Sequence, residues 1–370
     1  MDINVSPPLR ILVLYGTRPE LIKMAPVVRA LRRRPESFAT ILCTTAQHRQ
    51  MLDQMEQVFA LRPELDLDLM RADQGLNELA SRAFGALDRA LEEVAPGLLL
   101  VQGDTTTAMA GALAAFHRRV PVGHVEAGLR TGDLARPFPE EANRRIVDLV
   151  ADLCFAPTAL AGRLLAAEGV PAERIFVTGN TVVDALGWIS SLLPAEPPRD
   201  EVLLTVHRRE SFGAPLREIF SAVQELAAAF PGIRWIYPVH RNSHVWQAAH
   251  EMLTGLPNVE LHEPFDYLEL VRRLRAARFV LTDSGGIQEE APTFGKPVLV
   301  LREITERPEG VEAGVAKLVG SDRARIVAEA TRLLTGGEAY AAMSTAVNPY
   351  GDGHAAERIA DALAGWAAMR

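Results

Sequence analysis

The sequence predicts an α/β protein made of two Rossmann-like, doubly wound domains that face each other across a cleft. The first observation is the length of 370 residues, which is more than one hydrophobic core usually serves. The second is an alternation of short apolar runs with longer amphipathic stretches, which is typical of parallel strands covered by helices. The third is a proline-rich, acidic stretch, LLPAEPPRD at 192–200, which interrupts the alternation and is typical of an inter-domain linker.

Six apolar runs in the first half are expected to form the strands of one sheet. These runs are 11–16, 38–43, 97–103, 121–128, 152–157 and 174–180. The amphipathic stretches between them are expected to be helices, which include 19–33, 47–58, 105–117 and 158–167. Residues 1–191 are therefore assigned to an N-terminal Rossmann-like domain.

Six further apolar runs follow the linker and predict a second sheet of the same kind. They are 202–207, 234–240, 258–263, 279–286, 296–301 and 316–320. Helical segments separate them, so residues 200–352 are assigned to a C-terminal Rossmann-like domain. The last segment, 353–370, is expected to be a helix that could pack on either domain, including back on the N-terminal one.

Composition excludes several classes of protein. A net charge of −8 argues against a nucleic-acid or polyanion partner for the whole surface, while a local basic pocket remains compatible with it. The two cysteines, Cys43 and Cys154, lie in apolar runs and support neither a disulfide framework nor a cysteine metal site, which points to a reducing compartment. The first residues, MDINVSPPLRILVLYG, lack the pattern of a signal peptide, and no apolar run approaches ~18 residues. We therefore expect a cytoplasmic protein with no membrane span.

Unusual residues cluster where the predicted strands end, which is where ligands bind in sheets of this kind. After the first strand, GTRPELIK places Arg18 and Lys23 at a helix start, an arrangement that suits a bound anion; the alternative is a solvated helix. GDTTT places Asp104 at the next such position, where a carboxylate can be either a plain helix cap or a functional group.

The second half carries the clearest phosphate signal. TDSGGIQEEAP, at 282–292, is a strand end followed by Ser-Gly-Gly and a helix, so backbone N–H groups can approach an anion. Glu290, two turns into that helix, is placed to accept from ribose hydroxyls. The motif is neither the GxGxxG fingerprint nor a Walker loop, so neither NAD chemistry nor NTP hydrolysis is predicted.

Two histidines also follow strands, and each is trailed by arginine. His207 lies in TVHRRES and His240 in PVHRN. A histidine at a strand end is often structural, but two at the same edge of one sheet favour a role in the site. The spacing of histidines and cysteines does not match a zinc site, so no metal is expected.

The stretch GHVEAGLRTGDLARPFPEEANRR, at 123–145, carries four carboxylates on a segment rich in glycine and proline. Carboxylates gathered in a closed site can supply both an acid and a base, because their proximity raises the pKa of one of them. The four are Glu126, Asp133, Glu140 and Glu141. Asp133 is interpreted as a turn residue and Glu141 as a helix-start or surface charge.

Taken together, these motifs resemble the non-hydrolysing UDP-N-acetylglucosamine 2-epimerases of bacteria. The matching segments run from residue 11 to about 353 and include GTRPELIKMAP, TAQHRQMLDQ, GDTTT, PVGHVEAGLRTGD, PEEANR, GNTVVDAL, HRRESFG, YPVHRN, TDSGGIQEEAP, GKPVLVLR, TERPEG and NPYGDG. The resemblance implies the two-domain glycosyltransferase-B fold, with UDP bound by the C-terminal domain.

The resemblance also implies a reaction and a set of site residues. The reaction interconverts UDP-N-acetylglucosamine and UDP-N-acetylmannosamine by elimination and re-addition of UDP through a 2-acetamidoglucal, without a redox cofactor or a metal. The implied catalytic residues are Asp104, Glu126, Glu140 and His207. The implied substrate-binding residues are Arg18, Lys23, Phe265, Leu270, Ser284, Gly285, Gly286, Glu290 and Arg307.

Two departures from the family pattern carry their own expectations. Leu270 stands where an aromatic residue often lies beside uracil, so stacking worth ~0.5–1.5 kcal/mol is lost; Phe265 is then the expected neighbour of the base. A second, activating substrate site is implied at Gln47, Gln50, Arg208 and His240. Asp73 stands there in place of an expected arginine, which predicts weak substrate activation. The family implies a homodimer.

Three other functions fit parts of this pattern. A related epimerase could act on another UDP-sugar, such as a diacetamido uronic acid. A retaining glycosyltransferase shares the fold, but it leaves the carboxylates of 123–145 unexplained. A nucleotide-sugar sensor with an inactive site is disfavoured by the complete set of acid–base groups. Incubation with UDP-N-acetylglucosamine alone separates the three from the epimerase.

Overall fold

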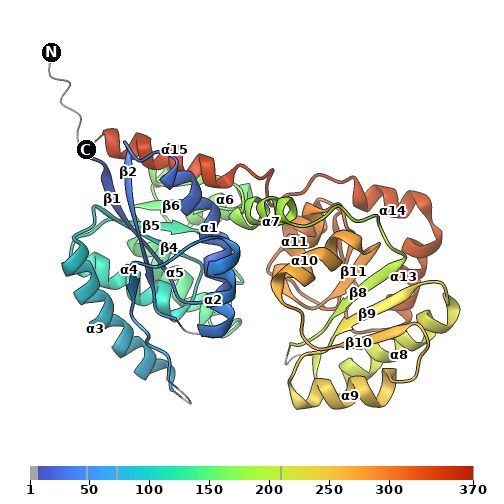
Figure 1. Cartoon of the computed structure of the whole chain (residues 1–370). Helices are drawn as coiled ribbons and strands as arrows, with labels where there is room; N and C mark the ends of the chain where they lie inside the picture. The colour runs from blue at the N-terminus through green and yellow to red at the C-terminus, as the bar shows by residue number, and fades with distance from the viewer. Residues whose placement is uncertain (1–6, 47–48, 72–73, 209–210, 370) are drawn as a thin grey trace. The chain divides into compact units, whose positions relative to one another are not determined.

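The structure is a computed structural model that describes residues 7–46, 49–71, 74–208 and 211–369 (Figure 1). The described chain forms two compact units. Unit 1 comprises 1–185 and 351–370, and unit 2 comprises 186–350. Each unit is an α/β body with one parallel sheet, so the predicted fold class is confirmed.

The sheet of unit 1 has seven parallel strands in the order β3-β2-β1-β4-β5-β6-β7. Their bounds are β1 Leu9–Tyr15, β2 Phe38–Thr44, β3 Leu65–Asp66, β4 Leu98–Gln102, β5 Val122–Val125, β6 Leu153–Ala156 and β7 Ile175–Val177. The register places Val13 between Leu42 and Leu100. The central strands β4, β5 and β6, and most of β1, are buried, which is why their sequences are continuous hydrophobic runs.

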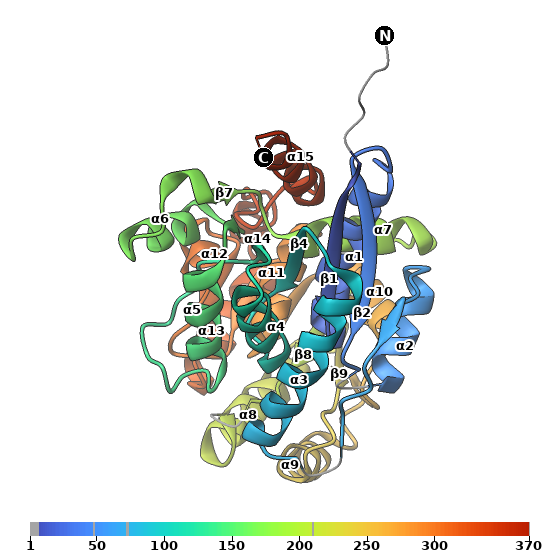
Figure 2. The same ribbon diagram turned by 90° about the vertical axis from the view of Figure 1, so that its left-hand side faces the viewer.

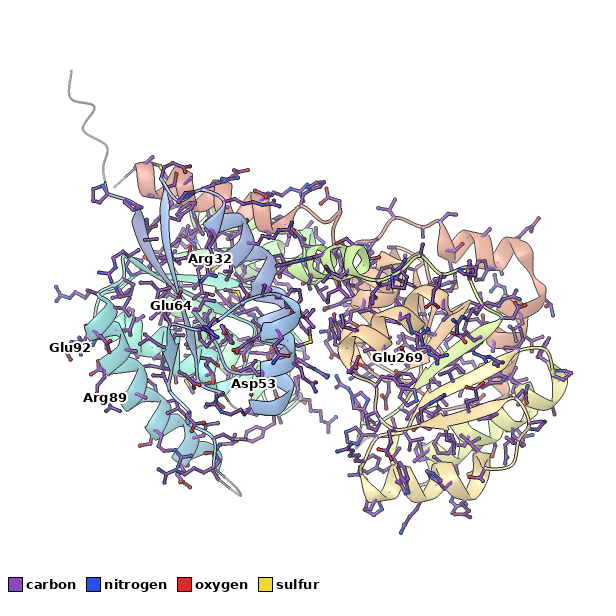
Figure 3. All side chains as sticks on the ribbon, in the orientation of Figure 1. Arg32, Asp53, Glu64, Arg89, Glu92 and Glu269 are labelled. Atoms are coloured by element: carbon purple, nitrogen blue, oxygen red, sulfur yellow. The ribbon has the colours of Figure 1, made fainter. Side chains whose placement is uncertain are left out.

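Helices cover both faces of this sheet. They are α1 Arg18–Arg32, α2 Arg49–Val58, α3 Leu76–Val94, α4 Thr106–His117, α5 Glu140–Val150, α6 Ala159–Ala167, α7 Thr181–Leu192 and α15 Ala355–Ala368. Helices α3 and α4 pack side by side (Figure 2), and α5 packs on α4. The outer side of α3 carries charged residues such as Arg89 and Glu92 (Figure 3). This contrast between apolar and charged faces is what the amphipathic sequence pattern predicts.

The C-terminal helix returns to unit 1 after the chain has completed unit 2. Helix α15 packs on α1 (Figure 1), and Arg34 at the end of α1 donates to Asp361 at 2.6 Å. The carboxylate of Asp184 accepts from the backbone N–H groups of Ala355 and Ala356, at 3.2 and 2.9 Å. Asp184 therefore caps the start of α15 in the way that helix-start N–H groups require.

Unit 2 repeats the architecture with six parallel strands in the order β10-β9-β8-β11-β12-β13. The strands are β8 Glu201–Thr205, β9 Arg234–Pro238, β10 Val259–His262, β11 Phe279–Thr282, β12 Val298–Val300 and β13 Ala316–Leu318. The helices are α8 Ala214–Ala229, α9 Ser243–Leu253, α10 Tyr267–Ala276, α11 Gly285–Thr293, α12 Pro308–Glu312, α13 Arg323–Thr335 and α14 Gly337–Ser344. Helix α8 packs on both α9 and α13, while α10 and α11 contribute to a separate core cluster.

The division between the units falls inside helix α7, between Ala185 and Leu186. The linker predicted at 192–200 begins where α7 ends and leads into β8. The domain limits predicted from the sequence, 191 and 200, stay predictions. None of the described helices is long and apolar enough to cross a membrane.

Candidate active site

Each sheet has one point where the strand order reverses direction. In unit 1 it lies between β1 and β4, and in unit 2 between β8 and β11. Ligands of doubly wound sheets bind at the carboxyl ends of the strands at this point. The segments that follow these four strands contain Arg18, Asp104, His207 and Ser284, which are four of the residues predicted from the sequence.

The start of α1 is held by a buried carboxylate, Glu20, that was not predicted to belong to the site. Glu20 accepts from the backbone N–H groups of Gly16 and Thr17 at 3.0 and 2.7 Å, and from the Thr105 hydroxyl at 2.7 Å. Burial raises the pKa of Glu20. The Glu20 carboxylate thus accepts hydrogen bonds from two backbone N–H groups at the position where the sequence suggested a bound anion. The signal was present as the spacing of Thr17 and Glu20, which is a capping box.

Glu126 is a buried carboxylate that directly follows β5, in the first part of the 123–145 stretch. Its backbone φ is 70°. Residues other than glycine rarely adopt this backbone conformation, and where they do it is often at a functional site. Glu126 is only 8% exposed, and its Oε2 accepts from the Lys23 ammonium at 2.5 Å and from the Gln102 amide. A neighbouring cation and an amide donor favour the ionised carboxylate, so the geometry suits a general base.

Lys23 was predicted to bind substrate, and the structure places its ammonium on Glu126. Arg18 begins α1 and is partly buried. Both residues lie at the switch point of unit 1. Gln102, which ends β4, was not predicted, because a single glutamine at the end of an apolar strand gives no sequence signal.

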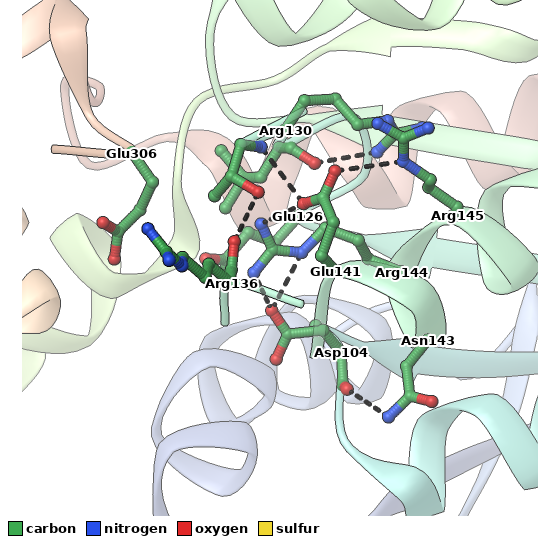
Figure 4. Close-up of polar contacts among 12 residues, drawn as sticks. Asp104, Glu126, Arg130, Arg136, Glu141, Asn143, Arg144, Arg145 and Glu306 are labelled. Carbon is green, nitrogen blue, oxygen red and sulfur yellow. Dashed lines mark hydrogen bonds and ion pairs between the residues drawn. The ribbon is translucent and has the colours of Figure 1, made fainter. Parts of the chain in front are cut away.

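Asp104 lies in the turn between β4 and α4 and is bound by an arginine from α5. Arg144 donates to its Oδ2 from Nε at 3.1 Å and from Nη2 at 2.5 Å (Figure 4). The backbone carbonyl of Asp104 accepts from the Asn143 side chain at 2.9 Å. The helix cap at this position is Thr105, so Asp104 is available for a role other than capping. The paired Arg144 was not predicted.

Glu140 and Glu141 are adjacent in α5 but differ in environment. Glu140 is partly exposed and has no hydrogen-bond or ion-pair partner among the described residues. Glu141 is completely buried, so the interpretation of Glu141 as a surface charge is wrong, although it does lie at the helix start. Its carboxylate accepts from the Arg145 guanidinium at 3.0 Å and from the backbone N–H of Thr131 at 3.1 Å (Figure 4). It therefore ties the segment after β5 to α5.

Asp133 behaves as the turn residue that was predicted. Its Oδ1 accepts from the backbone N–H of Ala135 at 2.9 Å, and the residue is exposed. This is the local hydrogen bond by which aspartate stabilises a turn.

Replacing Glu141 by glutamine is expected to loosen the segment 129–139. The amide keeps the shape of the side chain but removes the charge that Arg144 and Arg145 bind, which is expected to lower the free energy of unfolding by about 1–3 kcal/mol. Thermal melting and limited proteolysis within 129–139 measure the effect. Asp133→Asn is the matched control, and equal proteolysis of both variants would contradict a structural role for Glu141.

In unit 2, the start of α11 carries a guanidinium against the Ser-Gly-Gly motif. A Cβ at Gly285 would lie 2.7 Å from the Arg307 Nη1, so only glycine permits this approach. Ser284 is the N-cap residue and makes no side-chain cap bond. Helix-start N–H groups and an arginine together form an anion site. The structure thus brings together Ser284, Gly285 and Arg307, which were predicted to bind substrate.

Arg307 is oriented by two buried carboxylates that were not predicted to belong to the site. It donates to Glu289 at 2.6 Å and to Glu306 at 2.8 Å. Arg302 also donates to Glu306 at 2.6 Å, and Arg208 lies 3.4 Å from it. Burial opposes ionisation of Glu306, but the charges of Arg307, Arg302 and Arg208 outweigh it and lower the pKa of the carboxyl from 4.5 to about 2.

This lowered pKa predicts how Glu306→Gln affects stability. A carboxylate whose pKa is lowered by folding stabilises the protein above its unfolded pKa of 4.5, and the contribution is lost as the pH falls to about 2. Glu306→Gln is expected to lower the free energy of unfolding by about 3 kcal/mol at neutral pH. Urea unfolding from pH 7 downward should show the difference from the wild type shrinking below pH 4.5. The exposed neighbour Glu303 serves as the control, and a difference independent of pH would contradict the assignment.

The segment that contains His207 is held in place by hydrogen bonds to a buried carboxylate, that of Asp283. The Asp283 carboxylate accepts from the backbone N–H groups of His207 and Arg208, at 3.0 and 2.9 Å, and from the Ser211 hydroxyl at 3.0 Å. The His207 ring stacks on His240, with centroids 5.6 Å apart. Partial burial lowers the pKa of His207, and the neighbouring His240 and Arg208 act in the same direction against Asp283. His207 is therefore a neutral ring near pH 7.

The other residues predicted to bind the nucleotide lie on α10 and α11 or just before α10. Glu290, on α11, accepts from the Tyr267 hydroxyl at 3.1 Å. Gly286 follows Gly285 in the first turn of α11. Phe265 and Leu270 are partly buried against the same core cluster.

The predicted activating site is only partly visible. Gln47 and Asp73 lie outside the described residues, and Gln50 lies in α2 with a side chain that is also outside them. Arg208 and His240 are described, and both neighbour His207. Within the described ranges, no cluster of three or more His, Cys, Asp or Glu side chains could hold a metal ion.

Comparison with known proteins identifies close relatives. A family model described as UDP-N-acetylglucosamine 2-epimerase matches residues 29–364. The chain is 48% identical to the UDP-N-acetylglucosamine 2-epimerase of Yersinia pestis and 49% identical to that of Escherichia coli K12, over 96% of this chain and 98% of each relative. A crystal structure of UDP-GlcNAc 2-epimerase from Neisseria meningitidis bound to UDP-GlcNAc superposes with a TM-score of 0.89. It is 41% identical and covers 96% of this chain and 99% of its own.

Proposed function

Because the chain belongs to the UDP-N-acetylglucosamine 2-epimerase family, we propose that it interconverts UDP-N-acetylglucosamine and UDP-N-acetylmannosamine. The chain is an epimerase and hence an isomerase. The observation that carries the proposal is the buried Glu126 carboxylate, which accepts hydrogen bonds from Lys23 and Gln102. The backbone of Glu126 has a positive φ, which residues other than glycine rarely adopt. An ionised carboxylate fixed in this way is suited to removing a proton from carbon.

The proposed reaction eliminates UDP and adds it back. A base removes the proton from C2, the C1–O bond breaks with its electron pair leaving on the β-phosphate oxygen of UDP, and a C1–C2 double bond forms. An acid then protonates C2 from the opposite face while the UDP oxygen re-forms the bond to C1. No proton or electron is gained or lost overall, so the reaction needs no oxidant.

The acid–base groups of unit 1 divide between these steps. Glu126 serves as one group that exchanges the C2 proton. Glu140, whose side chain has no ionic partner among the described residues, serves as the other, as membership of the family suggests. Asp104 is held by Arg144, which fixes its orientation in the turn and supports a role at the sugar.

Unit 2 is proposed to bind the UDP portion. The start of α11, with Ser284, Gly285, Gly286 and the Arg307 guanidinium, is suited to the diphosphate. Glu290 is suited to the ribose hydroxyls, and Phe265 and Leu270 to the base. Neutral His207 can donate one hydrogen bond to the departing phosphate oxygen. The Neisseria meningitidis relative was crystallised bound to UDP-GlcNAc, which supports a UDP-sugar as the ligand.

Incubation of the protein with UDP-N-acetylglucosamine in deuterated water tests the proposal. We expect the manno epimer to form without any acceptor and to carry deuterium at C2, because the base exchanges its proton with solvent. Epimer that keeps the original hydrogen would point to a transient oxidation instead. Absence of the epimer, with turnover of a different N-acetylated UDP-sugar, would assign another substrate to the same chemistry.

Weak substrate activation is a separate expectation. Asp73 carries a negative charge where the family pattern has arginine, so a second anionic nucleotide sugar is expected to be repelled, and the loss of such a phosphate partner is worth ~1–3 kcal/mol. The rate should rise hyperbolically with UDP-N-acetylglucosamine, and the reverse reaction should proceed without it. Asp73→Arg is the matched variant, and sigmoidal kinetics in the wild type would contradict the expectation. The homodimer and the cytoplasmic location stay predictions.

A further inference from the structure

We propose that His124 is a positioning residue for the acid–base groups of unit 1, acting as a doubly protonated imidazolium that fixes the turn before Asp104. This proposal rests on the function proposed above. His124 lies in β5 and is completely buried. Its Nδ1 lies 2.6 Å from the Asp148 Oδ1, and its Nε2 lies 2.8 Å from the backbone carbonyl oxygen of Gly103.

Both neighbours of the ring are acceptors. A backbone carbonyl can only accept, so Nε2 must carry a hydrogen. The other oxygen of Asp148, Oδ2, lies 2.8 Å from the Arg130 guanidinium and accepts from the backbone N–H of Gly128 at 3.2 Å, and a cation and an N–H donor both favour the ionised carboxylate. Asp148 is therefore an ionised acceptor, and Nδ1 must carry a hydrogen as well. A ring that donates from both nitrogens is the imidazolium.

The charge on this ring is balanced by the groups around it. Arg130, from the segment after β5, lies 2.8 Å from the second oxygen of Asp148, which is on α5. Arg130 in turn donates to Glu168, at the end of α6, at 2.6 Å. Cys154 on β6 lies in register with His124 and is buried. Two cations and two carboxylates thus form a compact neutral network, which is what permits charged groups to be buried.

The two hydrogen bonds join three elements that carry the proposed catalytic residues. Gly103 has a φ of 70° and directly precedes Asp104. Glu126 lies two residues after His124. Asp148 is on α5, the helix that carries Glu140 and that holds Asp104 through Arg144. One ring therefore sets the turn, the strand end and the helix relative to one another. Displacing a catalytic group by about 1 Å can slow a reaction on the order of 10²-fold.

Two substitutions separate the bond to Gly103 from the bond to Asp148. The glutamine amide of His124→Gln can replace the Nε2 donor to the Gly103 carbonyl, whereas the shorter amide of His124→Asn can replace only the Nδ1 donor to Asp148. We expect His124→Asn to lower kcat roughly 10- to 100-fold with KM unchanged, and His124→Gln to retain most of kcat. Thermal melting verifies that both variants fold. Equal kcat for both variants would overturn the proposal.

Two readouts test the charge on the ring directly. Nitrogen-15 NMR of histidine-labelled wild type should show both ring nitrogens of His124 protonated at neutral pH. Asp148→Asn removes the counter-charge, so its kcat should fall more steeply than that of the wild type as the pH rises. One unprotonated nitrogen in the wild type, or identical pH profiles, would overturn the proposal. Wild type that does not epimerise UDP-N-acetylglucosamine would overturn the proposed function instead, and the NMR result would still decide the state of His124.

Discussion

Replacing Glu126 by glutamine should lower the turnover of UDP-N-acetylglucosamine by ~10²–10⁴-fold, the usual contribution of a general acid–base group. Glutamine keeps the length of the side chain and can still accept from Lys23, but it cannot take up the C2 proton. UDP affinity should change little, because the proposed diphosphate site is built from unit 2 residues such as Ser284 and Arg307. Steady-state kinetics and calorimetric titration with UDP measure the two quantities.

Asp133→Asn is the control for Glu126→Gln, since both substitutions replace a carboxylate of the same segment by its amide. Asp133 is exposed and bonded only within its own turn, so its variant should lose less than about tenfold in turnover. Deuterium uptake at C2 should be lost together with epimerisation in Glu126→Gln. Near-normal epimerisation by Glu126→Gln, with an inactive Asp133→Asn, would reverse the assignment of base and bystander.

Glu140→Gln is expected to have an effect of similar size, ~10²–10⁴-fold on turnover. Glu140 differs from Glu126 in that its side chain has no ion-pair partner among the described residues. A variant blocked only at re-protonation strands the intermediate, so free UDP and 2-acetamidoglucal should accumulate. Chromatography of the reaction mixture measures both products.

Glu141→Gln is the matched control for Glu140→Gln, because the two glutamates are neighbours on α5. Glu141 is buried between Arg144, Arg145 and the backbone of the preceding segment. Its variant should lose stability without releasing the glucal. If Glu141→Gln accumulates glucal and Glu140→Gln does not, the two roles are exchanged.

Much of the fold could be predicted because a buried parallel strand leaves an unmistakable run of apolar residues. The runs at 11–16 and 202–207 became β1 and β8 with small shifts at their ends. Strand β3 was missed because Leu65–Asp66 is too short to show a pattern. The run predicted at 121–128 ends early, at Val125, because Glu126 adopts a positive φ that a strand cannot continue.

The candidate site was predicted less completely, and the reason is physical. Residues that face a ligand follow strands in recognisable motifs, whereas residues that hold them in place come from distant parts of the chain. Arg144 reaches Asp104 across 40 positions, and Asp283 reaches the His207 segment across 76. Such pairings exist only after folding, so spacing along the sequence carries no trace of them. Glu20 is the exception, because its capping partner Thr17 is local.

The order of the chain has a consequence for synthesis on the ribosome. Unit 2 is one uninterrupted segment, 186–350, and its residues are all made before the last helix of unit 1. The sheet of unit 1 is complete once β7 has emerged, but α1 lacks its neighbour α15 and Asp184 has no helix start to cap until the final residues appear. Contacts between such distant segments are the slowest to form. The contacts of α15 with the rest of unit 1 can therefore form only after every residue of unit 2 has been made.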